Sequence, residues 1–436
     1  MSAKGPGGNI VIAIDHASIT GGQAKVALES ALGLKEAGYN PIVFAAAAPV
    51  DRRLAGAGIE VVCLGQADLL GNSSKAAAAV QGTWNFLAEA EMRKLLARLP
   101  REKTIVHVHG WAKALSASIA RPIRQSGLPA VYTMHEYFMF CPNGGFYNYQ
   151  KNHVCKLAPL SAACWATHCD SRTYPRKVWR SLRQTVMERA ARLPQIFDDF
   201  ILISRFQAGV VEHRLPKGAR VHAVSNPIDC HDLGRKPEPA RGDFLFVGRM
   251  STEKGPQLFA EAARRAGVIP VFAGDGPAAA ALREAYPEAR LLGWKSPDEV
   301  KRLMRAARVL VFPSLWFEGQ PLTVLEAKAM GTPIVVSDGC AGREEVENGV
   351  SGLWFESANA DSLAQALVKA RDDALVASMS NACYDAFWAD PPTLARHVER
   401  LGAVYAEILA RRGVAAESAA LNSGLDRDSI PAAARP

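Results

Sequence analysis

The order of apolar and polar residues divides the chain into alternating predicted strands and helices. Residues 9–14, NIVIAI, form a continuous apolar run that is typical of a buried strand. Residues 21–39 carry apolar side chains at helical spacing, and residues 41–46 form the next apolar run. Because parallel strands need a crossover connection, this order predicts a strand, a helix and a second, parallel strand.

The alternation continues to about residue 205, breaks over the polar segment 212–229, and then starts again. Two parallel sheets, each covered by helices on both faces, account for this pattern. We therefore predict an α/β fold of two Rossmann-like, doubly wound domains, with ligands bound in a cleft at the carboxyl ends of the strands. The other predicted strands are residues 104–110, 130–135, 200–204, 244–249, 269–274, 307–314 and 332–338.

Composition and charge agree with a multidomain globular protein. The chain has 436 residues, 49% of them hydrophobic, which is enough for two or three cores. It shows neither a signal peptide nor a run of about 18 apolar residues, so we expect a cytoplasmic protein. The net charge of +8 suits nucleotides, lipid phosphates or anionic bilayers, although many basic proteins bind none of these.

Two glutamates, Glu318 and Glu326, follow the predicted strand that ends near residue 314. In a continuous helix they would lie roughly 12 Å apart. Hydrolytic carboxyl pairs act on one bond at about 5–10 Å. Between the glutamates, Pro321 starts a predicted helix whose free N–H groups, together with Gly319, suit a phosphate. The pattern predicts a nucleotide sugar, with its diphosphate between two hydroxyl-bearing sugars. A solvated helix face is the alternative.

Two cations follow an earlier predicted strand in FVGRMSTEKG (246–255). Gly248 and Arg249 stand at the strand end, and Lys254 stands at the entry of the next helix. Two cations on one loop can neutralise a leaving diphosphate. The alternative is a pair of surface cations on a polar loop.

Four segments of the C-terminal half, residues 246–255, 273–277, 292–314 and 317–338, come in a fixed order. They resemble the consecutive signatures of family 4 of the retaining glycosyltransferases, which have the GT-B fold. Their order and spacing match those of the family. The N-terminal half resembles the family more loosely, in the glycine-rich segment 19–39 and in TMHEY (133–137), where the family has His-Asp and this chain has His-Glu. Further matches are an interdomain turn at 224–229 and a crossing helix at 384–409.

The resemblance implies domain limits. The acceptor domain would span residues 9–215, with a Cys-rich and basic insert at about 141–195, and the donor domain would span 216–385. Residues 386–412 would form the helix that crosses back onto the first domain. The segment 413–436 lacks apolar periodicity, so we expect a disordered tail.

The resemblance also implies roles for individual residues. Arg249 and Lys254 would hold the donor diphosphate, Glu318 would bind the donor sugar and Glu326 would bind the ribose. His135 would face the donor sugar from the other domain. The candidate catalytic residues are Arg249, Lys254, Glu318 and His135. A histidine at a strand end is often structural instead. The other candidate donor-binding residues are Gly21, Gly22, Gly248, Trp294, Gly319, Gln320, Leu322 and Thr323.

The expected activity is retaining transfer of a sugar from a nucleotide-diphosphate sugar to a glycan or lipid-linked acceptor in cell-surface polysaccharide synthesis. The resemblance implies front-face attack, no obligatory cofactor or catalytic metal, and no nucleic-acid partner. A nucleotide-sugar 2-epimerase of the same fold and a non-catalytic nucleotide-sugar-binding subunit are the alternatives. A dehydrogenase is disfavoured, because DHASITGG (15–22) lacks the Gly-x-Gly-x-x-Gly turn. Of two further histidines, His109 is predicted to face the cleft and His107 the core.

Four cysteines, Cys141, Cys155, Cys164 and Cys169, crowd the insert. A chain without a secretion signal keeps its thiols reduced. A structural zinc site, unpaired thiols and an iron–sulfur cluster are the interpretations that stay open, because the spacing lacks paired Cys-x-x-Cys knuckles.

A basic stretch, residues 171–194, follows these cysteines. It carries seven Lys or Arg residues, and Trp179 and Leu182 fall near one helical face. It suits either a contact with an anionic membrane at its inner face or a core helix with a solvated basic face. The basic residues are Arg172, Arg176, Lys177, Arg180, Arg183, Arg189 and Arg192.

Overall fold

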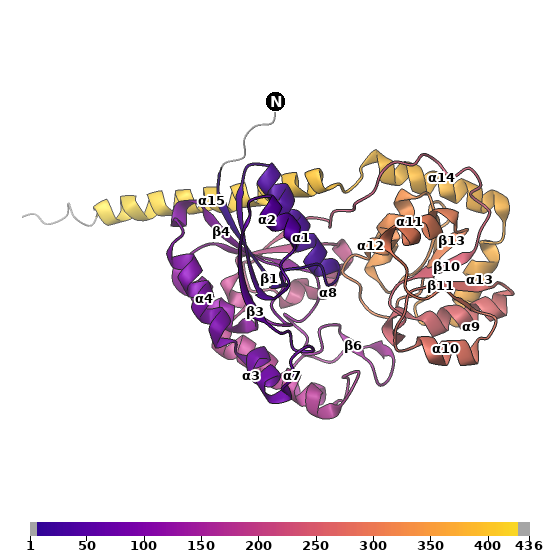
Figure 1. Cartoon of the computed structure of the whole chain (residues 1–436), viewed down its shortest axis with the longest axis horizontal. Coiled ribbons are helices and arrows are strands. Elements are labelled where there is room, and N and C mark those ends of the chain that lie inside the picture. Colours follow the sequence, from indigo (N-terminus) through magenta and orange to yellow (C-terminus); the bar gives the residue numbers. More distant parts are fainter. Residues whose placement is uncertain (1–6, 426–436) are drawn as a thin grey trace, which may run out of the picture.

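Two parallel β-sheets form two domains that lie side by side (Figure 1). The computed structural model describes residues 7–425, with the N-terminal domain in indigo to magenta and the C-terminal domain in orange to yellow. Each sheet has one apolar cluster on each of its faces. This arrangement confirms the α/β, doubly wound fold predicted from the apolar runs.

The N-terminal sheet has seven strands in the order β3-β2-β1-β4-β5-β8-β9. Side chains of β1 alternate between the two faces, with Val11 in one cluster and Ile10 and Ile12 in the other. Strands β3 and β9 were not predicted, because neither is a buried apolar run. The strands are β1 (Asn9–His16), β2 (Asn40–Ala47), β3 (Glu60–Gln66), β4 (Thr104–Val108), β5 (Ala130–Met134), β8 (Asp199–Leu202) and β9 (Arg220–Ala223).

The C-terminal sheet has six strands in the order β12-β11-β10-β13-β14-β15. Its central strands, β10 and β13, are fully buried. These two strands pair in parallel, so both end at the same edge of the sheet. The strands are β10 (Phe244–Val247), β11 (Pro270–Ala273), β12 (Arg290–Leu291), β13 (Val309–Phe312), β14 (Ile334–Ser337) and β15 (Gly352–Phe355).

Helices cover the sheets and join their strands. Within residues 7–425, no helix is long and apolar enough to cross a bilayer. The α-helices are α1 (Gly22–Glu36), α2 (Arg52–Gly56), α3 (Lys75–Thr83), α4 (Phe86–Ala97), α5 (Ala120–Ser126), α6 (Ala162–Ala166), α7 (Tyr174–Val186), α8 (Arg205–Val211), α9 (Pro256–Ala266), α10 (Ala279–Ala285), α11 (Pro297–Ala306), α12 (Leu322–Ala329), α13 (Ala360–Lys369), α14 (Asp373–Ala389) and α15 (Leu394–Leu425).

The long helix α15 returns from the C-terminal domain to the N-terminal domain, where it runs along α1 (Figure 1). The Nε2 atom of His397 lies 2.9 Å from Ser30 Oγ. A Cβ on Gly33 would lie 2.7 Å from Val398 Cγ2, so the glycine lets the two helices approach closely. The first turns of α15 thus pack on the first domain.

Three predicted limits need correction. The domain boundary lies after β9 instead of at residue 216, because β9 pairs with β8 of the first sheet. The returning helix starts at Leu394, since residues 386–389 still belong to α14. Residues 413–425, expected to be disordered, continue α15, whose Ala-rich sequence favours a helix without an amphipathic pattern. The rest of that predicted tail, 426–436, lies outside the described residues.

Candidate functional site

An ion pair stands where β13 and β10 end in the C-terminal domain. Lys254 Nζ donates to Glu318 Oε1 at 2.7 Å, and Ser314 Oγ donates to the same oxygen at 2.7 Å. The Lys254 ammonium also lies 5.2 Å from the centre of the Trp316 ring. The Glu318 side chain is 9% exposed and that of Lys254 is 26% exposed. Two of the predicted site residues therefore contact each other directly.

Close backbone approaches fix the loop that carries Lys254. Gly255 has φ +70°, and a Cβ there would lie 2.1 Å from the Pro313 carbonyl oxygen. Gly274 has φ +145°, and its Cβ would lie 1.9 Å from the Gly248 oxygen. A residue with a side chain would be strained and would clash at both positions. These glycines allow the loops after β10, β11 and β13 to pack backbone against backbone.

Arg249 is the second predicted cation of this loop. Its side chain is exposed. Among residues 7–425, no carboxylate forms an ion pair with it. It lies near Tyr149 of the insert; burial raises the pKa of Tyr149, and the Arg249 charge opposes part of that rise. An unpaired guanidinium on the same loop as Lys254 is available to bind an anion.

The N-termini of two helices point toward the interface between the domains. Helix α12 begins after Pro321, and no side chain caps it. Helix α1 begins after Gly21, which also provides no side-chain cap. A Cβ on Gly22 would lie 3.7 Å from Leu322 Cδ1, so the two helix starts are close to each other. Uncapped N–H groups at a helix start bind anions.

Glu326, one turn into α12, stands apart from Glu318. Burial raises the pKa of its carboxyl, while the nearby cations Lys25 and Lys301 act to lower it and Asp229 acts to raise it. Its neighbours thus differ completely from the Lys254 and Ser314 partners of Glu318. The two carboxylates occupy separate positions, as their spacing along the chain predicts.

The histidines lie at the carboxyl ends of β4 and β5. His135 Nε2 and His109 Nδ1 are 3.1 Å apart, and the two rings are stacked. Burial lowers the pKa of His135 to about 3 and lowers that of His109 well below its usual value, so both rings are neutral at pH 7. His107 is fully buried and bonds to Tyr405 of α15 and to Thr133. It is a core residue, as predicted.

Aromatic residues join the two domains next to the Lys254–Glu318 pair, and the sequence did not indicate this contact. Tyr137 Oη donates to the Glu318 carbonyl oxygen at 3.4 Å. The rings of Tyr137 and Phe146 lie 6.4 and 6.5 Å from the ring of Phe317. A Cβ on Gly145 would lie 2.8 Å from Trp316. The insert therefore packs on the loop that carries Glu318.

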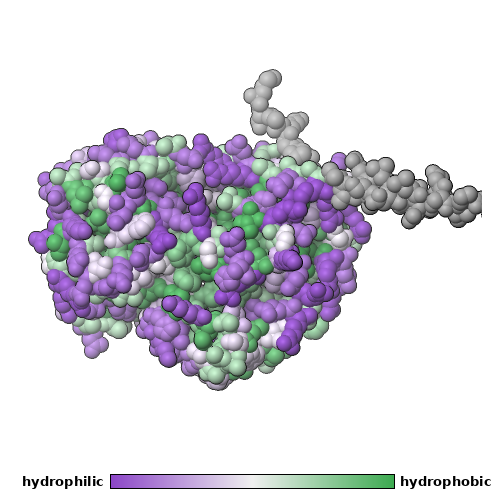
Figure 2. All heavy atoms as spheres, turned by 180° about the vertical axis from the view of Figure 1, so that it is seen from behind, coloured by the Kyte–Doolittle hydropathy of each residue, from purple (hydrophilic) through white to green (hydrophobic). Residues whose placement is uncertain are grey.

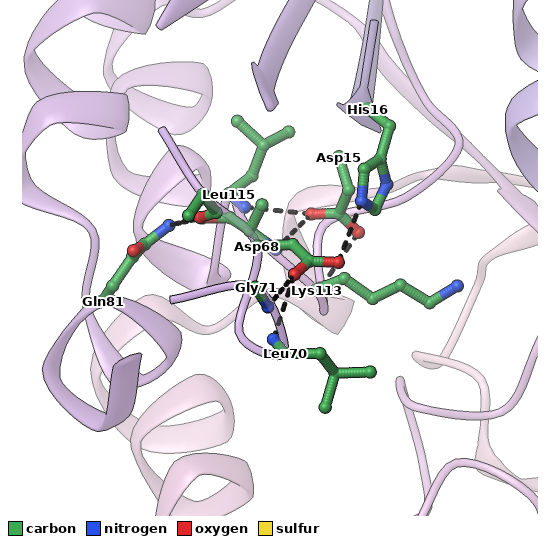
Figure 3. A network of polar contacts seen from close by, with 10 residues as sticks. Asp15, His16, Asp68, Leu70, Gly71, Gln81, Lys113 and Leu115 are labelled. Atoms are coloured by element: carbon green, nitrogen blue, oxygen red, sulfur yellow. Dashed lines mark hydrogen bonds and ion pairs between the residues drawn. The ribbon is translucent and has the colours of Figure 1, made fainter. Parts of the chain in front are cut away.

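A polar network shapes the facing edge of the N-terminal sheet (Figure 3). Asp15, at the end of β1, accepts N–H groups of Lys113, Ala114 and Leu115 at 3.0, 2.7 and 2.9 Å. The neighbouring His16 and Asp68 are 3.1 Å apart. The network holds the loops after β3 and β4 together, and the Lys113 ammonium extends away from both carboxylates. An Asp-His pair directly after an apolar run is the signal that could have found it.

Glu136 is the glutamate of TMHEY, to which sequence reasoning gave no role. It follows His135, and burial raises the pKa of its carboxyl to about 7. Its Oε2 accepts the N–H of Phe138 at 3.1 Å. A carboxyl that titrates near neutral pH at a strand end is a candidate hydrogen-bonding group for a hydroxyl.

The remaining predicted residues have mixed surroundings. Gly319 lies against the N-terminal domain, since its Cβ would be 3.2 Å from the His135 oxygen. Gln320 Oε1 accepts the N–H of Asn226 at 2.7 Å, which links it to the interdomain connection. Trp294 is 73% exposed and packs little on the protein. Gly248, Leu322 and Thr323 lie in the loop after β10 and in the first turn of α12.

The structure brings the four cysteines of the insert together. Cys141, Cys155, Cys164 and Cys169 line one cavity of about 20 Å³, beside the buried Lys177. All four are free thiols. Within the part of the chain that the structure describes, no group of three or more His, Cys, Asp or Glu side chains is arranged to hold a metal ion. This arrangement does not support the zinc site, which stays a prediction.

Solved structures share this two-domain arrangement. Sucrose-phosphate synthase from Thermosynechococcus elongatus superposes with a TM-score of 0.66 at 16% identity, over 93% of this chain and 100% of that chain. HepE from Anabaena, in complex with UDP, superposes with a TM-score of 0.62 at 14% identity, over 92% of this chain and 100% of that chain. The two domains of this protein thus form the GT-B fold of glycosyltransferases.

Two sequence models identify the family. The one described as glycosyl transferases group 1 matches residues 241–373, and the one described as glycosyl transferase 4-like domain matches residues 21–227. The chain belongs to the group 1 glycosyltransferases, which are family 4, as its motifs indicate.

Curated relatives match about half of their own length or less. The Escherichia coli UDP-Gal:alpha-D-GlcNAc-diphosphoundecaprenol alpha-1,3-galactosyltransferase is 34% identical over 39% of this chain and 47% of its own length. The Corynebacterium glutamicum GDP-mannose-dependent alpha-mannosyltransferase is 27% identical over 46% of this chain and 45% of its own length. The Campylobacter jejuni N,N'-diacetylbacillosaminyl-diphospho-undecaprenol alpha-1,3-N-acetylgalactosaminyltransferase is 33% identical over 36% of this chain and 43% of its own length.

Proposed function

We propose that this protein transfers a sugar, with retention of its anomeric configuration, from a nucleotide-diphosphate sugar to a hydroxyl of a lipid-linked glycan. One observation carries the proposal. The exposed Arg249, the Lys254–Glu318 pair and the uncapped start of α12 lie on neighbouring loops at one sheet edge. Cations and helix N–H groups stabilise a diphosphate, and a carboxylate accepts hydrogen bonds from sugar hydroxyls.

We assign each group a task from its position. Arg249 and the N–H groups at the start of α12 bind the diphosphate. Its negative charge competes with Glu318 for the Lys254 ammonium, which is 2.7 Å from the carboxylate. Glu318 keeps its bond from Ser314 and turns its remaining acceptor sites to the sugar. Glu326, further along α12, binds the ribose.

The reaction then needs no side-chain nucleophile. The acceptor oxygen bonds to the anomeric carbon on the face that the diphosphate leaves, the bond from that carbon to the phosphate oxygen breaks, and this oxygen takes the acceptor's proton. Arg249 and Lys254 stabilise the negative charge that grows on the leaving group. His135, neutral because its pKa is lowered to about 3, contributes a hydrogen bond and no charge.

The curated relatives support the acceptor class. The Escherichia coli and Campylobacter jejuni relatives are described as acting on diphosphoundecaprenol-linked sugars. We extend the same class, a glycan on a lipid diphosphate, to this chain. The base and sugar of the donor stay open, since one relative uses UDP-Gal and another uses GDP-mannose.

A donor screen tests this proposal. The purified protein is heated with UDP-, GDP-, ADP- and dTDP-sugars, and release of the nucleoside diphosphate is measured in parallel. A donor at about 100 times its Kd should stabilise the fold by about 2.7 kcal/mol. One donor that raises the melting temperature and is slowly cleaved supports transfer. Conversion of the sugar would indicate an epimerase, and no response to any donor would contradict the proposal.

A further inference from the structure

Helix α7 presents apolar side chains to solvent and buries polar ones. Tyr174, Val178 and Leu182, one turn apart from each other, are 40, 38 and 51% exposed. Lys177 and Ser181 of the same helix are 1 and 0% exposed. A helix on the surface of a monomeric protein normally has the reverse pattern. The inverted pattern contradicts the interpretation of this stretch as a core helix with a solvated basic face.

The buried polar side of α7 is well satisfied. Lys177 Nζ donates to Ser181 Oγ at 2.8 Å and to Cys164 Sγ at 3.4 Å. Arg183 donates to the Ala112 oxygen at 2.8 Å. Trp179 Nε1 donates to the Ala79 oxygen of α3 at 3.3 Å. These hydrogen bonds fix the orientation of α7. Its apolar side chains are therefore exposed because of the way the helix is held, and not because the helix is loosely packed.

Neighbouring segments extend this exposed apolar area. Val80 of α3 is 60% exposed, and Phe86 and Leu87 at the start of α4 are 69 and 43% exposed. Helices α3 and α7 form the lower edge of the N-terminal domain in Figure 1, and green and white atoms gather at that edge in Figure 2, which views the molecule from behind. An exposed apolar area of this kind marks an interaction surface. We call it the α3–α7 face, formed by Val80, Phe86, Leu87, Tyr174, Val178 and Leu182.

Unpaired cations flank the α3–α7 face. Lys75, Arg172, Arg189 and Arg192 are exposed. None of them forms an ion pair within residues 7–425. Arg189 lies just beyond the end of α7, in the π-helix Met187–Ala191 that continues it. An apolar strip with arginines at its border is the composition of a surface that lies in a bilayer interface.

We propose that the α3–α7 face docks on an anionic lipid bilayer, with its apolar side chains at the acyl boundary and its cations among the head groups. This inference deepens the proposed function and rests on the lipid-linked acceptor proposed there. A bilayer fits the face better than a protein partner does, because the unpaired arginines match an anionic surface in any orientation around the apolar strip. The contact places the N-terminal domain on the membrane that holds the acceptor.

Vesicle flotation of the whole protein tests the docking. The protein is mixed with vesicles of phosphatidylcholine alone or with phosphatidylglycerol added, at low and high salt. We expect binding to the anionic vesicles only, weakened by salt. Leu182→Asp should abolish it, and Arg189→Glu should weaken it about thirtyfold, which is about 2 kcal/mol for a change of two charges. Equal binding to both vesicle types, or none to either, would overturn the docking.

Matched variants on the other domain serve as controls. Val368→Asp places the same charge at a helical aliphatic residue that is 50% exposed, and Arg283→Glu reverses an exposed arginine of α10. Both should float like the unchanged protein, and equal losses in these controls would contradict the assignment of the face. Transfer to a detergent-solubilised acceptor separates the two proposals. The Leu182→Asp variant should still transfer sugar to this acceptor. If neither the unchanged protein nor any variant turned over a donor, the proposed transferase function would be contradicted, but the docking would not.

Discussion

Replacing Lys254 by alanine should damage catalysis far more than stability. The substitution removes the ammonium that lies 2.7 Å from Glu318 Oε1 and leaves that carboxylate with its bond from Ser314. Breaking a fully buried ion pair costs about 3–5 kcal/mol. Because the Lys254 side chain is 26% exposed, water compensates part of the loss, and we expect about 1–2 kcal/mol.

The expected loss of transfer is larger. A preorganised cation at a leaving diphosphate acts as an electrostatic stabiliser of the transition state. Removal of one such donor typically lowers the rate by a factor of about 10² to 10³, or about 2.7–4 kcal/mol. Lys254→Ala should therefore reduce kcat by this factor while the free energy of unfolding falls by only about 1–2 kcal/mol.

Lys328→Ala is the matched control. Lys328 lies 3.1 Å from Glu345 in the same domain, and the two side chains are 13 and 23% exposed. The variant breaks a comparable Lys–Glu pair outside the proposed site. Sugar transfer by single-turnover kinetics and urea unfolding are measured for both variants. The reasoning is refuted if Lys254→Ala transfers sugar at the unchanged rate, or if both variants lose transfer equally.

Three other predictions concern the loops, the histidines and the thiols. Gly255→Ala should lower the free energy of unfolding by about 1–3 kcal/mol, because φ is +70° and the new Cβ would lie 2.1 Å from the Pro313 oxygen; Gly267→Ala, with φ +64° and open space, should cost clearly less in the same urea titration. His135 has a pKa of about 3 in the folded protein and about 6.5 when unfolded, so the unfolded chain binds more protons between these values. Stability should then fall as the pH is lowered from about 6.5 toward 3, by up to about 1.4 kcal/mol per pH unit, and His135→Asn should flatten this slope while a change of the exposed His213 should not. The zinc prediction requires one equivalent of zinc in protein purified under reducing conditions and its loss in a Cys141→Ser variant; metal analysis that finds neither zinc nor iron would contradict both metal interpretations of the cysteine cluster.

The strands and the site loops could be predicted because their signals are local. Buried parallel strands are apolar runs, and Gly248, Arg249 and Lys254 follow one of them within a few residues. The carboxyl ends of neighbouring parallel strands meet at one edge, which is why Glu318 lies near Lys254. The direct bond between Lys254 and Glu318 joins residues 64 positions apart, and no local pattern encodes it.

Features that depend on packing partners were missed. The polar side of α7 is buried because Cys164 and Ala112 accept hydrogen bonds from Lys177 and Arg183, and neither partner belongs to α7 itself. Strand β9 is exposed and polar, and only its pairing with β8 shows that it belongs to the first sheet. The last turns of α15 were also missed, because their residues favour a helix but show no apolar periodicity.

Proton NMR of a complete reaction tests the central claim most directly. The protein is mixed with the α-linked nucleotide sugar that stabilises it and with an acceptor carrying a sugar on a lipid diphosphate, and the anomeric signals are followed with time. We predict that the donor signal is replaced by that of an α-glycoside on the acceptor, and that the signal weakens at least about a hundredfold with Lys254→Ala. A β-linked product would contradict retention, and an unchanged donor would contradict the assignment of this protein as a transferase.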